Sequence, residues 1–309
     1  MTDIVADTAD AIRDMKIRGA GRIARAAASA IGEFAAGYKG SSLEKFIADT
    51  DSAKARLLGS RPTAVSLWNG VYSSTKGIRS AGSFEEAKVS VIKDSKKFVD
   101  SSSKAVEFIA RAGADRINNG DVILTHCNSS ASVGVLKEAH RQGKNFRVYA
   151  TETRPWRQGL ITATELADAG IDVTLIVDSA VRTVMSKVDR VFVGADTITS
   201  DGSLVNKVGT SQIAVIAKEF GVEFNVCSET YKFSPKTILG EPVVIEERER
   251  EEVVKAGEVP DTVKVFNPVF DITPGTYISR IITEAGVLPP GAVYGTMIRE
   301  FGDGIFELK

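Results

Sequence analysis

The chain has 309 residues, of which 43% are hydrophobic and 26% charged, and its formal net charge is −1. This balance is typical of a globular protein and argues against a general nucleic-acid binder or a polybasic membrane surface. No apolar run approaches the roughly 20 residues of a membrane span, and the N-terminal MTDIVADTADAIRD lacks the apolar core of a signal peptide. Its two cysteines, Cys127 and Cys227, form no disulfide framework, so we expect a reducing, cytoplasmic location.

Residues 1–118 are predicted to form a helical N-terminal domain. IVADTADAIRDMKI and RIARAAASAIGEFAAGY place apolar residues at helical spacing, and SSLEKFIADTDSAKARLLG opens with a Ser and a Glu in the manner of a capping box. A long, charged amphipathic stretch runs from residue 83 to residue 117. No segment in this part indicates a strand.

The pattern changes at NNGD, residues 118–121, where short β-branched runs begin to alternate with helical stretches. The expected strands are Val122–Thr125, Arg147–Ala150, Val173–Val177, Arg190–Val193, Glu223–Cys227 and Val263–Phe266. The expected helices are Ala131–Gln142, Thr162–Ala169, Ser179–Ser186 and Thr210–Phe220. Repeated βα units of this kind predict a doubly wound parallel sheet, so residues 119–309 should form a Rossmann-like α/β domain.

The first candidate site residue lies in VILTHCNSSASVGVL. Open α/β sheets bind ligands outside the carboxyl ends of their strands, and Cys127 comes directly after a predicted strand. Asn128, Ser129 and Ser130 are natural N-cap residues for the following helix. A helix N-terminus is expected to lower the pKa of a nearby thiol, and it also binds phosphate. The alternative is a buried structural cysteine, which is how we interpret Cys227.

A second strand end, VFVGADTITSDGSLVNKVGT, places Asp196 after an apolar strand and two small residues. A carboxylate there can act as a general acid or base, and Asn206 and Lys207 could hold an anionic substrate. The alternative is that Asp196 only caps a turn. We interpret DGS, residues 201–203, as a turn.

Two further stretches offer or mimic ligand sites. TETRPWRQG presents Arg154, Arg157 and Gln158 as donors to phosphate or sugar hydroxyls, with an exposed arginine loop as the alternative. IRGAGRIA mimics a dinucleotide fingerprint, but it follows a helix rather than a strand, so we reject a nicotinamide cofactor. A glycine-rich turn into a helix can still bind phosphate, and Arg18 and Arg61 could support it.

No metal site is expected. His126 adjoins Cys127, and neighbours on an extended chain point to opposite faces. His140 is the other histidine, and no metal-ligand spacing joins these residues. EERERE, residues 246–251, is interpreted as a solvated charge run.

Eight motifs together resemble a known family. RGAG, RPTAVSL, THCNS, TETRP, GADTIT, NKVGT, ETYKFSP and NPVFDITP occur in this order from residue 18 to residue 274. The set resembles the superfamily of methylthioribose-1-phosphate isomerase and the regulatory subunits of translation initiation factor 2B, and within it the archaeal ribose-1,5-bisphosphate isomerase branch. This resemblance implies a helical N-terminal domain and a Rossmann-like C-terminal domain.

The resemblance also implies site residues. Cys127 and Asp196 occupy the positions of the catalytic pair. Implied substrate contacts are Arg18, Gly19, Ala20, Arg61, Gln158, Asn206 and Lys207. We add Ser129 from its place at a helix start, and Gly21 and Arg154 from their places in the glycine-rich turn and the TETRP loop.

The implied reaction converts α-D-ribose 1,5-bisphosphate to ribulose 1,5-bisphosphate in AMP and nucleoside breakdown, without a cofactor. Cys127 would act as acid and then as base, Asp196 would exchange the hydroxyl proton, and hydrogen would pass from C2 to C1 as a proton or a hydride. The family branch also implies activation by AMP and a homo-oligomer, a hexamer built from dimers. Neither a nucleic acid nor a membrane is an expected partner.

Two other functions remain open. Asn128 follows the cysteine as in the methylthioribose branch, whose substrate needs an apolar site in place of a second phosphate site. A non-catalytic subunit of an initiation-factor-2B-like complex is the other alternative, although such subunits need not keep Cys127 and Asp196. The number of phosphate donors favours the bisphosphate.

Overall fold

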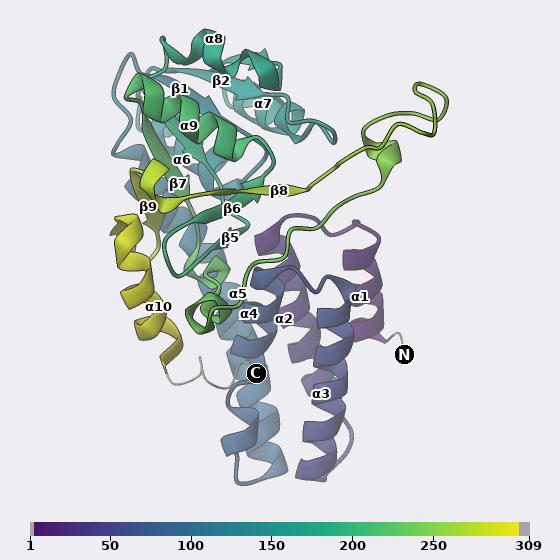
Figure 1. Cartoon of the computed structure of the whole chain (residues 1–309). Coiled ribbons are helices and arrows are strands. Elements are labelled where there is room, and N and C mark those ends of the chain that lie inside the picture. Colours follow the sequence, from purple (N-terminus) through teal and green to yellow (C-terminus); the bar gives the residue numbers. More distant parts are fainter. Residues whose placement is uncertain (1–2, 303–309) are drawn as a thin grey trace. The chain divides into compact units, whose positions relative to one another are not determined.

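The computed structural model describes residues 3–302 of the chain (Figure 1). The chain divides into two compact units, Met1–Ala105 and Val106–Lys309. This boundary falls inside helix α5, Phe84–Ala114, whereas the sequence pattern changes only after that helix has ended. The reason lies in packing, because Ala87 and Val91 belong to the core of the first unit and Ile109 to that of the second.

Helices make up the described part of the first unit, as expected. Besides the first two thirds of α5, its elements are α1 Ile4–Arg13, α2 Ala20–Gly37, α3 Leu43–Ser60, α4 Val65–Thr75 and the 3₁₀ turn η1 Ile78–Ser80. Side-chain caps start two of them, because Asp3 accepts the N–H of Ala6 and Ser42 accepts that of Lys45. The apolar faces meet in one core that includes Ile23, Phe46 and Leu57. Within residues 3–302, no helix combines the length and apolar character needed to cross a membrane.

The second unit is built on a seven-stranded sheet of order β10-β9-β7-β4-β1-β2-β3. All neighbouring strands run parallel except β10, which is antiparallel to β9. The strands are β1 Val122–Thr125, β2 Arg147–Thr151, β3 Asp172–Ile176, β4 Arg190–Val193, β7 Glu223–Cys227, β9 Arg280–Thr283 and β10 Gly286–Leu288. The predicted parallel sheet is therefore confirmed, and the bounds of β1, β4 and β7 agree with the sequence expectation.

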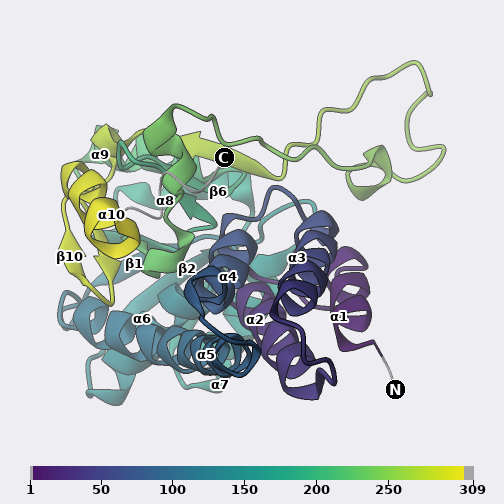
Figure 2. The same ribbon diagram turned by 90° about the horizontal axis from the view of Figure 1, so that it is seen from below.

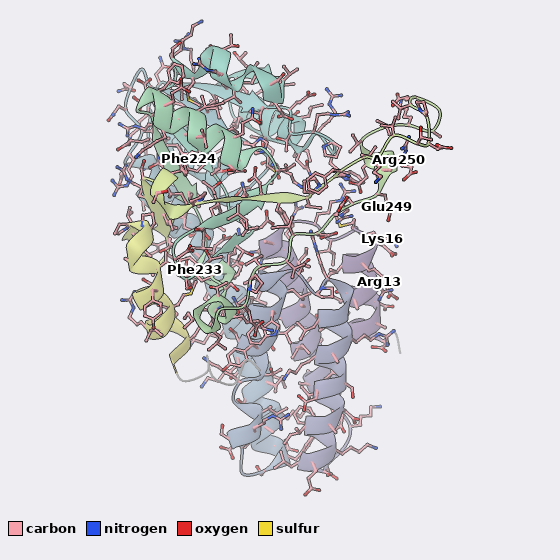
Figure 3. The ribbon with its side chains drawn as sticks, in the orientation of Figure 1. Arg13, Lys16, Phe224, Phe233, Glu249 and Arg250 are labelled. Carbon is pink, nitrogen blue, oxygen red and sulfur yellow. The ribbon has the colours of Figure 1, made fainter. Side chains whose placement is uncertain are left out.

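Helices cover both faces of this sheet. They are α6 Ser130–Arg141, α7 Gln158–Asp168, α8 Val181–Met185, α9 Thr210–Phe220 and α10 Val293–Phe301. The connecting segments of this unit contain the short 3₁₀ turns η2 Asp178–Ala180, η3 Thr230–Lys232, η4 Pro235–Leu239, η5 Arg250–Glu252, η6 Gly275–Tyr277 and η7 Pro290–Ala292. Successive strand residues point to opposite faces, so Leu124 packs in a core with α8, α9 and α10, and Ile123 in a core with α6 and α7. Figure 2 shows α6 on the opposite side of the sheet from α9 and α10. Phe224 and Phe233, marked in Figure 3, both belong to the first of these cores.

A charged ladder joins the amino ends of four neighbouring strands. Arg190 at the start of β4 donates to Asp121, which precedes β1, with an Nε–Oδ2 distance of 3.0 Å, and it also pairs with Glu223 at the start of β7. Arg280 at the start of β9 completes the ladder through Glu223, at 2.5 Å. Because each cation or anion links two strands, the ladder holds their order and register at the edge opposite the carboxyl ends.

A second, three-stranded antiparallel sheet was not predicted. Its order is β5-β6-β8, with β5 at Thr197–Ile198, β6 at Leu204–Lys207 and β8 at Phe270–Thr273. DGS forms the turn between β5 and β6, where the Asp201 carboxylate accepts from Thr199 and Ser203.

Residues 240–269, which we call the arm, extend away from the seven-stranded sheet before β8 (Figures 1 and 2). The expectation of a strand at Val263–Phe266 is wrong, because this run lies in the arm and Phe266 is 77% exposed, with no neighbouring strand to cover it. The EERERE run also lies here, where Arg248 pairs with Glu246 and Arg250, marked in Figure 3, donates to the carbonyl of Val263.

Candidate functional site

The strand order singles out one position at the carboxyl edge of the sheet. From β1 the chain adds β2 and β3 on one side, and then returns to place β4 on the other side. Ligands of open α/β folds bind at such a switch point. Cys127 follows β1, and Asp196 follows β4 after two small residues. Both Asp196 and Lys207 act electrostatically on the thiol of Cys127, so the structure brings these three predicted residues together.

Gly194 lets the two strand ends approach closely. A Cβ atom built on it would lie 2.3 Å from the Cβ of Ser129, a distance that real side chains do not tolerate. Ser129 is the N-cap of α6, as expected, and its hydroxyl faces the N–H of Ser132. The glycine of GAD and the serine of THCNS therefore fit against each other.

The backbone of Cys127 is left-handed, with φ at 67°. For a residue with a side chain, this conformation costs about 1–2 kcal/mol relative to the right-handed one. Two threonines hold it: Thr153 Oγ1 accepts the Cys127 N–H at 2.9 Å, and Thr162 Oγ1 donates to the Cys127 carbonyl at 2.7 Å. We call Thr153 and Thr162 the threonine clamp. Asn128 supports this clamp, because its amide donates to Thr162 Oγ1 at 3.0 Å. Sequence reasoning missed both threonines, since neither lies near Cys127 in the chain.

The expected lowering of the thiol pKa is wrong. Burial raises the pKa of Cys127 to about 11, and the Asp196 carboxylate adds to the rise. Lys207 and the backbone N–H of Asn128 act in the opposite direction, but they do not outweigh desolvation. Although partly exposed, Cys127 is therefore a protonated thiol at neutral pH, suited to donate a proton rather than to attack as a thiolate.

Lys207 and Asn206 lie next to each other on β6. Lys207 is only 8% exposed, and its ammonium lies 5.2 Å from the centre of the Phe270 ring. Among the described residues, no carboxylate lies within ion-pair distance of it. A nearly buried cation without an anion is costly, so this position favours an anionic ligand. The Asn206 amide donates to Thr210 Oγ1 at 3.0 Å, which orients it at the start of α9.

Asp271 on β8 holds the same helix start. Its carboxylate accepts the N–H of Gly209 at 2.7 Å and that of Ser211 at 3.1 Å. Burial raises the pKa of Asp271 to about 6, against the effect of these donors. Asp271 of the NPVFDITP motif thus holds the backbone of the NKVGT loop in place, and no feature of the sequence indicated this link.

The TETRP loop is oriented by Asp178, which follows β3. Its carboxylate accepts the N–H groups of Thr153 and Arg154 at 2.8 and 2.7 Å. The guanidinium of Arg154 donates to the Val253 carbonyl of the arm, and Gln158 begins α7. Asp178 carries a sequence signal like the one that identified Asp196, a carboxylate close behind an apolar strand, and it could have been found in that way.

Gln158 differs from its neighbours in the loop. Its side-chain oxygen is buried and has no hydrogen-bond partner within the described part of the chain. Such an acceptor is costly to leave unmade, so the amide suits a ligand hydroxyl. Arg157, by contrast, pairs with Glu152 at 3.3 Å and caps α7 in a left-handed conformation.

The remaining candidates lie in the first unit. Gly19, with φ at 84°, is the N-cap of α2, and Ala20 and Gly21 form its first turn. Arg18 donates from Nε to the Met15 carbonyl at 2.7 Å. Arg61 is the C-cap residue that follows α3. The glycine-rich stretch is therefore a turn into a helix, and it does not follow a strand.

Cys227 fits the interpretation of a structural cysteine. It is fully buried at the end of β7, and burial raises the pKa of its thiol. Among residues 3–302, no group of three or more His, Cys, Asp or Glu side chains is arranged to hold a metal ion.

The chain resembles known proteins along nearly its whole length. Residues 16–290 match the model of the initiation factor 2 subunit family. Ribose 1,5-bisphosphate isomerase from Methanocaldococcus jannaschii is 50% identical over 97% of this chain and 96% of its own. Methylthioribose-1-phosphate isomerase from Thermosipho melanesiensis is 37% identical, over 92% and 86%. The solved structure of translation initiation factor eIF-2B from Pyrococcus horikoshii superposes with a TM-score of 0.80 at 28% identity, over 94% and 98%.

Proposed function

Because the chain belongs to the initiation factor 2 subunit family, we propose that it is an aldose–ketose isomerase converting α-D-ribose 1,5-bisphosphate to ribulose 1,5-bisphosphate. One observation carries the proposal: Cys127, Asp196 and Lys207 meet at the switch point of the sheet. This arrangement supplies a proton donor, a carboxylate and a cation for an anionic sugar. The relative that is half identical to this chain has the name of this activity.

The chemistry starts from a closed ring. Cys127 donates its proton to the ring oxygen, the bond from C1 to that oxygen breaks, and C1 becomes electron-poor. The hydrogen on C2 then moves to C1, while the Asp196 carboxylate takes the proton from the C2 hydroxyl. C2 becomes a carbonyl, C1 keeps its phosphate, and a proton returning from Asp196 to Cys127 restores the enzyme. Such positioned acid–base groups each contribute about 10²–10⁴-fold to a rate.

The raised pKa of Cys127 supports the first step. A thiol with a pKa of about 11 holds its proton at neutral pH, so the resting enzyme has the acid that ring opening requires. If the hydrogen on C2 leaves as a proton, Cys127 as thiolate is the base that receives it and returns it to C1. The product then gains deuterium at C1 in heavy water, whereas a hydride shift leaves C1 unlabelled.

The substrate argument rests on phosphate donors and on Asn128. Lys207 and the start of α6 at Ser129 provide one cation and one helix N-terminus in this unit. Asn128, which resembles the methylthioribose branch, donates to Thr162 in the clamp, so its presence does not argue for that substrate. Contacts from Arg18, Gly19, Ala20, Gly21, Arg61, Arg154, Gln158 and Asn206 remain predictions.

Phosphorus NMR with α-D-ribose 1,5-bisphosphate tests the proposal. The wild type should replace the anomeric phosphate signal by that of ribulose 1,5-bisphosphate, with Cys127→Ser and Asp196→Asn inactive. Cys227→Ala is the matched cysteine control, and it should keep its activity because Cys227 lies in the core. A wild type that leaves the substrate untouched, with and without AMP, contradicts the proposal. Methylthioribose 1-phosphate and capture of initiation factor 2 then test the two alternatives.

The proposal includes three further expectations. The first is a homo-oligomer, a hexamer assembled from three dimers, whose mass light scattering would report. The second is activation by AMP, which would appear as a higher rate in the same NMR assay. The third is a cytoplasmic location, which suits the free thiols of Cys127 and Cys227.

A further inference from the structure

His126 lies directly before Cys127, yet its side chain serves neither a metal nor the surface. It is 2% exposed, and both ring nitrogens have partners. Nδ1 lies 2.6 Å from Thr151 Oγ1 at the end of β2, and Nε2 lies 3.0 Å from the Val208 carbonyl oxygen. Val208 follows Lys207 in the NKVGT loop. The imidazole therefore contacts one strand end and one loop that are both distant from it in sequence.

These partners determine the protonation of the ring. A carbonyl oxygen only accepts, so Nε2 must carry a proton and donate it to Val208. Burial lowers the pKa of His126, which keeps the ring neutral and leaves Nδ1 as an acceptor. The Thr151 hydroxyl then donates to Nδ1. With both nitrogens engaged within the protein, the imidazole has no free position for exchanging a proton with a substrate.

The close fit of Gly209 gives independent support. A Cβ atom at Gly209 would lie 3.2 Å from Cε1 and 3.3 Å from Nε2 of the imidazole, tighter than most real contacts. Gly209 also has φ at 103°, a conformation that strains other residues. The NKVGT loop is thus shaped around the ring of His126.

We propose that His126 is a positioning residue whose neutral imidazole joins the ends of β1 and β2 to the NKVGT loop, so that Cys127 and Lys207 face the same ligand. Thr151 connects to the clamp as well, because its hydroxyl lies 3.3 Å from Thr153 Oγ1, which accepts the Cys127 N–H. The imidazole is thus linked to Cys127 by the peptide bond between them and by the hydrogen bonds of Thr151 and Thr153. It is linked to Lys207 by its hydrogen bond to Val208, the next residue in the chain. The proposal rests on the proposed function for the roles of Cys127 and Lys207.

Three substitutions distinguish the hydrogen bond to Thr151 from the hydrogen bond to Val208. His126→Leu removes both bonds and puts an apolar side chain in place of the ring. His126→Gln can place an amide nitrogen near the Nε2 position and restore the bond to Val208. His126→Asn can place an amide oxygen near Nδ1 and restore the bond from Thr151. Thr125→Val is the matched control, because Thr125 immediately precedes His126 and its buried Oγ1 has no partner in the described residues.

Kinetics give the first measurement. His126→Leu should lower kcat by about 10- to 100-fold, the effect expected from a displacement near 1 Å, and raise KM as well. His126→Gln should bring KM back toward the wild-type value, because it restores the hydrogen bond to Val208, the neighbour of Lys207. His126→Asn should bring kcat back, because it restores the hydrogen bond from Thr151, which supports Cys127. Thr125→Val should match the wild type in both constants.

Alkylation gives a measurement that needs no substrate. The rate at which iodoacetamide modifies Cys127, followed by mass spectrometry of its peptide, should change in His126→Leu and return in His126→Asn. If folded His126→Leu keeps the wild-type kcat, KM and alkylation rate, the proposal is wrong. If His126→Leu does not fold, the other two variants decide. The proposal is then wrong if His126→Gln lacks a KM near the wild-type value and His126→Asn lacks a kcat near it. A wild type inactive on the bisphosphate refutes the proposed function alone, and the alkylation rates still decide the role of His126.

Discussion

Cys127 and Thr153 both have left-handed backbones, with φ at 67° and 62°, and the N–H of the first donates to the hydroxyl of the second at 2.9 Å. Neither residue is a glycine, so each conformation is strained. Strain of this kind persists where the surroundings over-determine it, and it gathers at functional sites. The Asp178 carboxylate holds the Thr153 N–H in turn, so the strained pair is fixed from both sides.

Removing the hydroxyl of Thr153 should release the strained cysteine. Thr153→Val leaves the Cys127 N–H without its acceptor, and we expect kcat to fall by about 10- to 100-fold as the thiol moves. Thr153→Ser keeps the oxygen and should stay near wild type. Steady-state kinetics with the bisphosphate measure the effect. Equal kcat values for Val and Ser would show that the bond to Cys127 does not matter for the reaction.

Two neighbours should shift the thiol pKa in opposite directions. The cation of Lys207 favours the thiolate, so Lys207→Met should raise the pKa of Cys127 above its value of about 11. The Asp196 carboxylate disfavours the thiolate, so Asp196→Asn should lower that pKa. The pH dependence of alkylation at Cys127, measured between pH 7 and the alkaline limit of folding, reports both. Shifts of the same sign would contradict the electrostatic arrangement.

Asp271 should weaken folding as the pH rises toward neutrality. Its pKa of about 6 lies above the usual value, so its contribution to stability is fully present below about pH 4 and is lost as the pH rises through 6. Two pKa units correspond to about 3 kcal/mol. Urea unfolding of wild type and Asp271→Asn should give a stability difference that shifts in favour of the wild type on acidification from pH 7 to pH 4. A constant difference would mean that Asp271 is ionised throughout.

A buried ion pair in the ETYKFSP motif should be costly to break. Glu229 and Lys232 lie 2.7 Å apart with exposed fractions of 0% and 6%, and the Tyr231 hydroxyl donates to Glu229. Lys232→Met leaves the buried Glu229 carboxylate without its cation and should destabilise the protein by about 3–5 kcal/mol. The double variant Glu229→Gln and Lys232→Met should recover most of that loss. Thermal or urea unfolding of the single variants and the double variant measures this double-mutant cycle. Additive losses in the free energy of unfolding would show that the two charges do not interact.

The fold was predictable where local pattern and tertiary packing agree. Runs such as Val122–Thr125 are buried on both faces of a parallel sheet, so hydrophobicity alone marked them. The short antiparallel strands of the second sheet escaped because β5 has only two residues and β8 includes the exposed Ile272. The prediction of a strand at Val263–Phe266 was wrong for the converse reason, since a run rich in valine needs a neighbouring strand before it can join a sheet.

The candidate site divides in the same way. Cys127 and Asp196 follow strands, and a rule about strand ends finds them. Thr153 and Thr162 do not stand out, because their roles depend on which loops the fold brings together. The direction of the thiol pKa was wrong for a related reason: the helix start is visible in the sequence, whereas the burial that outweighs it is a property of the folded protein.

The charged ladder at the amino ends of the strands has an evolutionary consequence. Arg190, Glu223 and Arg280 hold strand order at one edge, while Cys127 and Asp196 lie at the other. Selection can therefore act on the two edges separately, and substitutions at the carboxyl ends need not endanger the architecture. Such a scaffold can lose or exchange its chemistry through gradual drift and still fold. The relatives of this chain bear the names of isomerases and of a translation factor, as expected of a fold that carries more than one function.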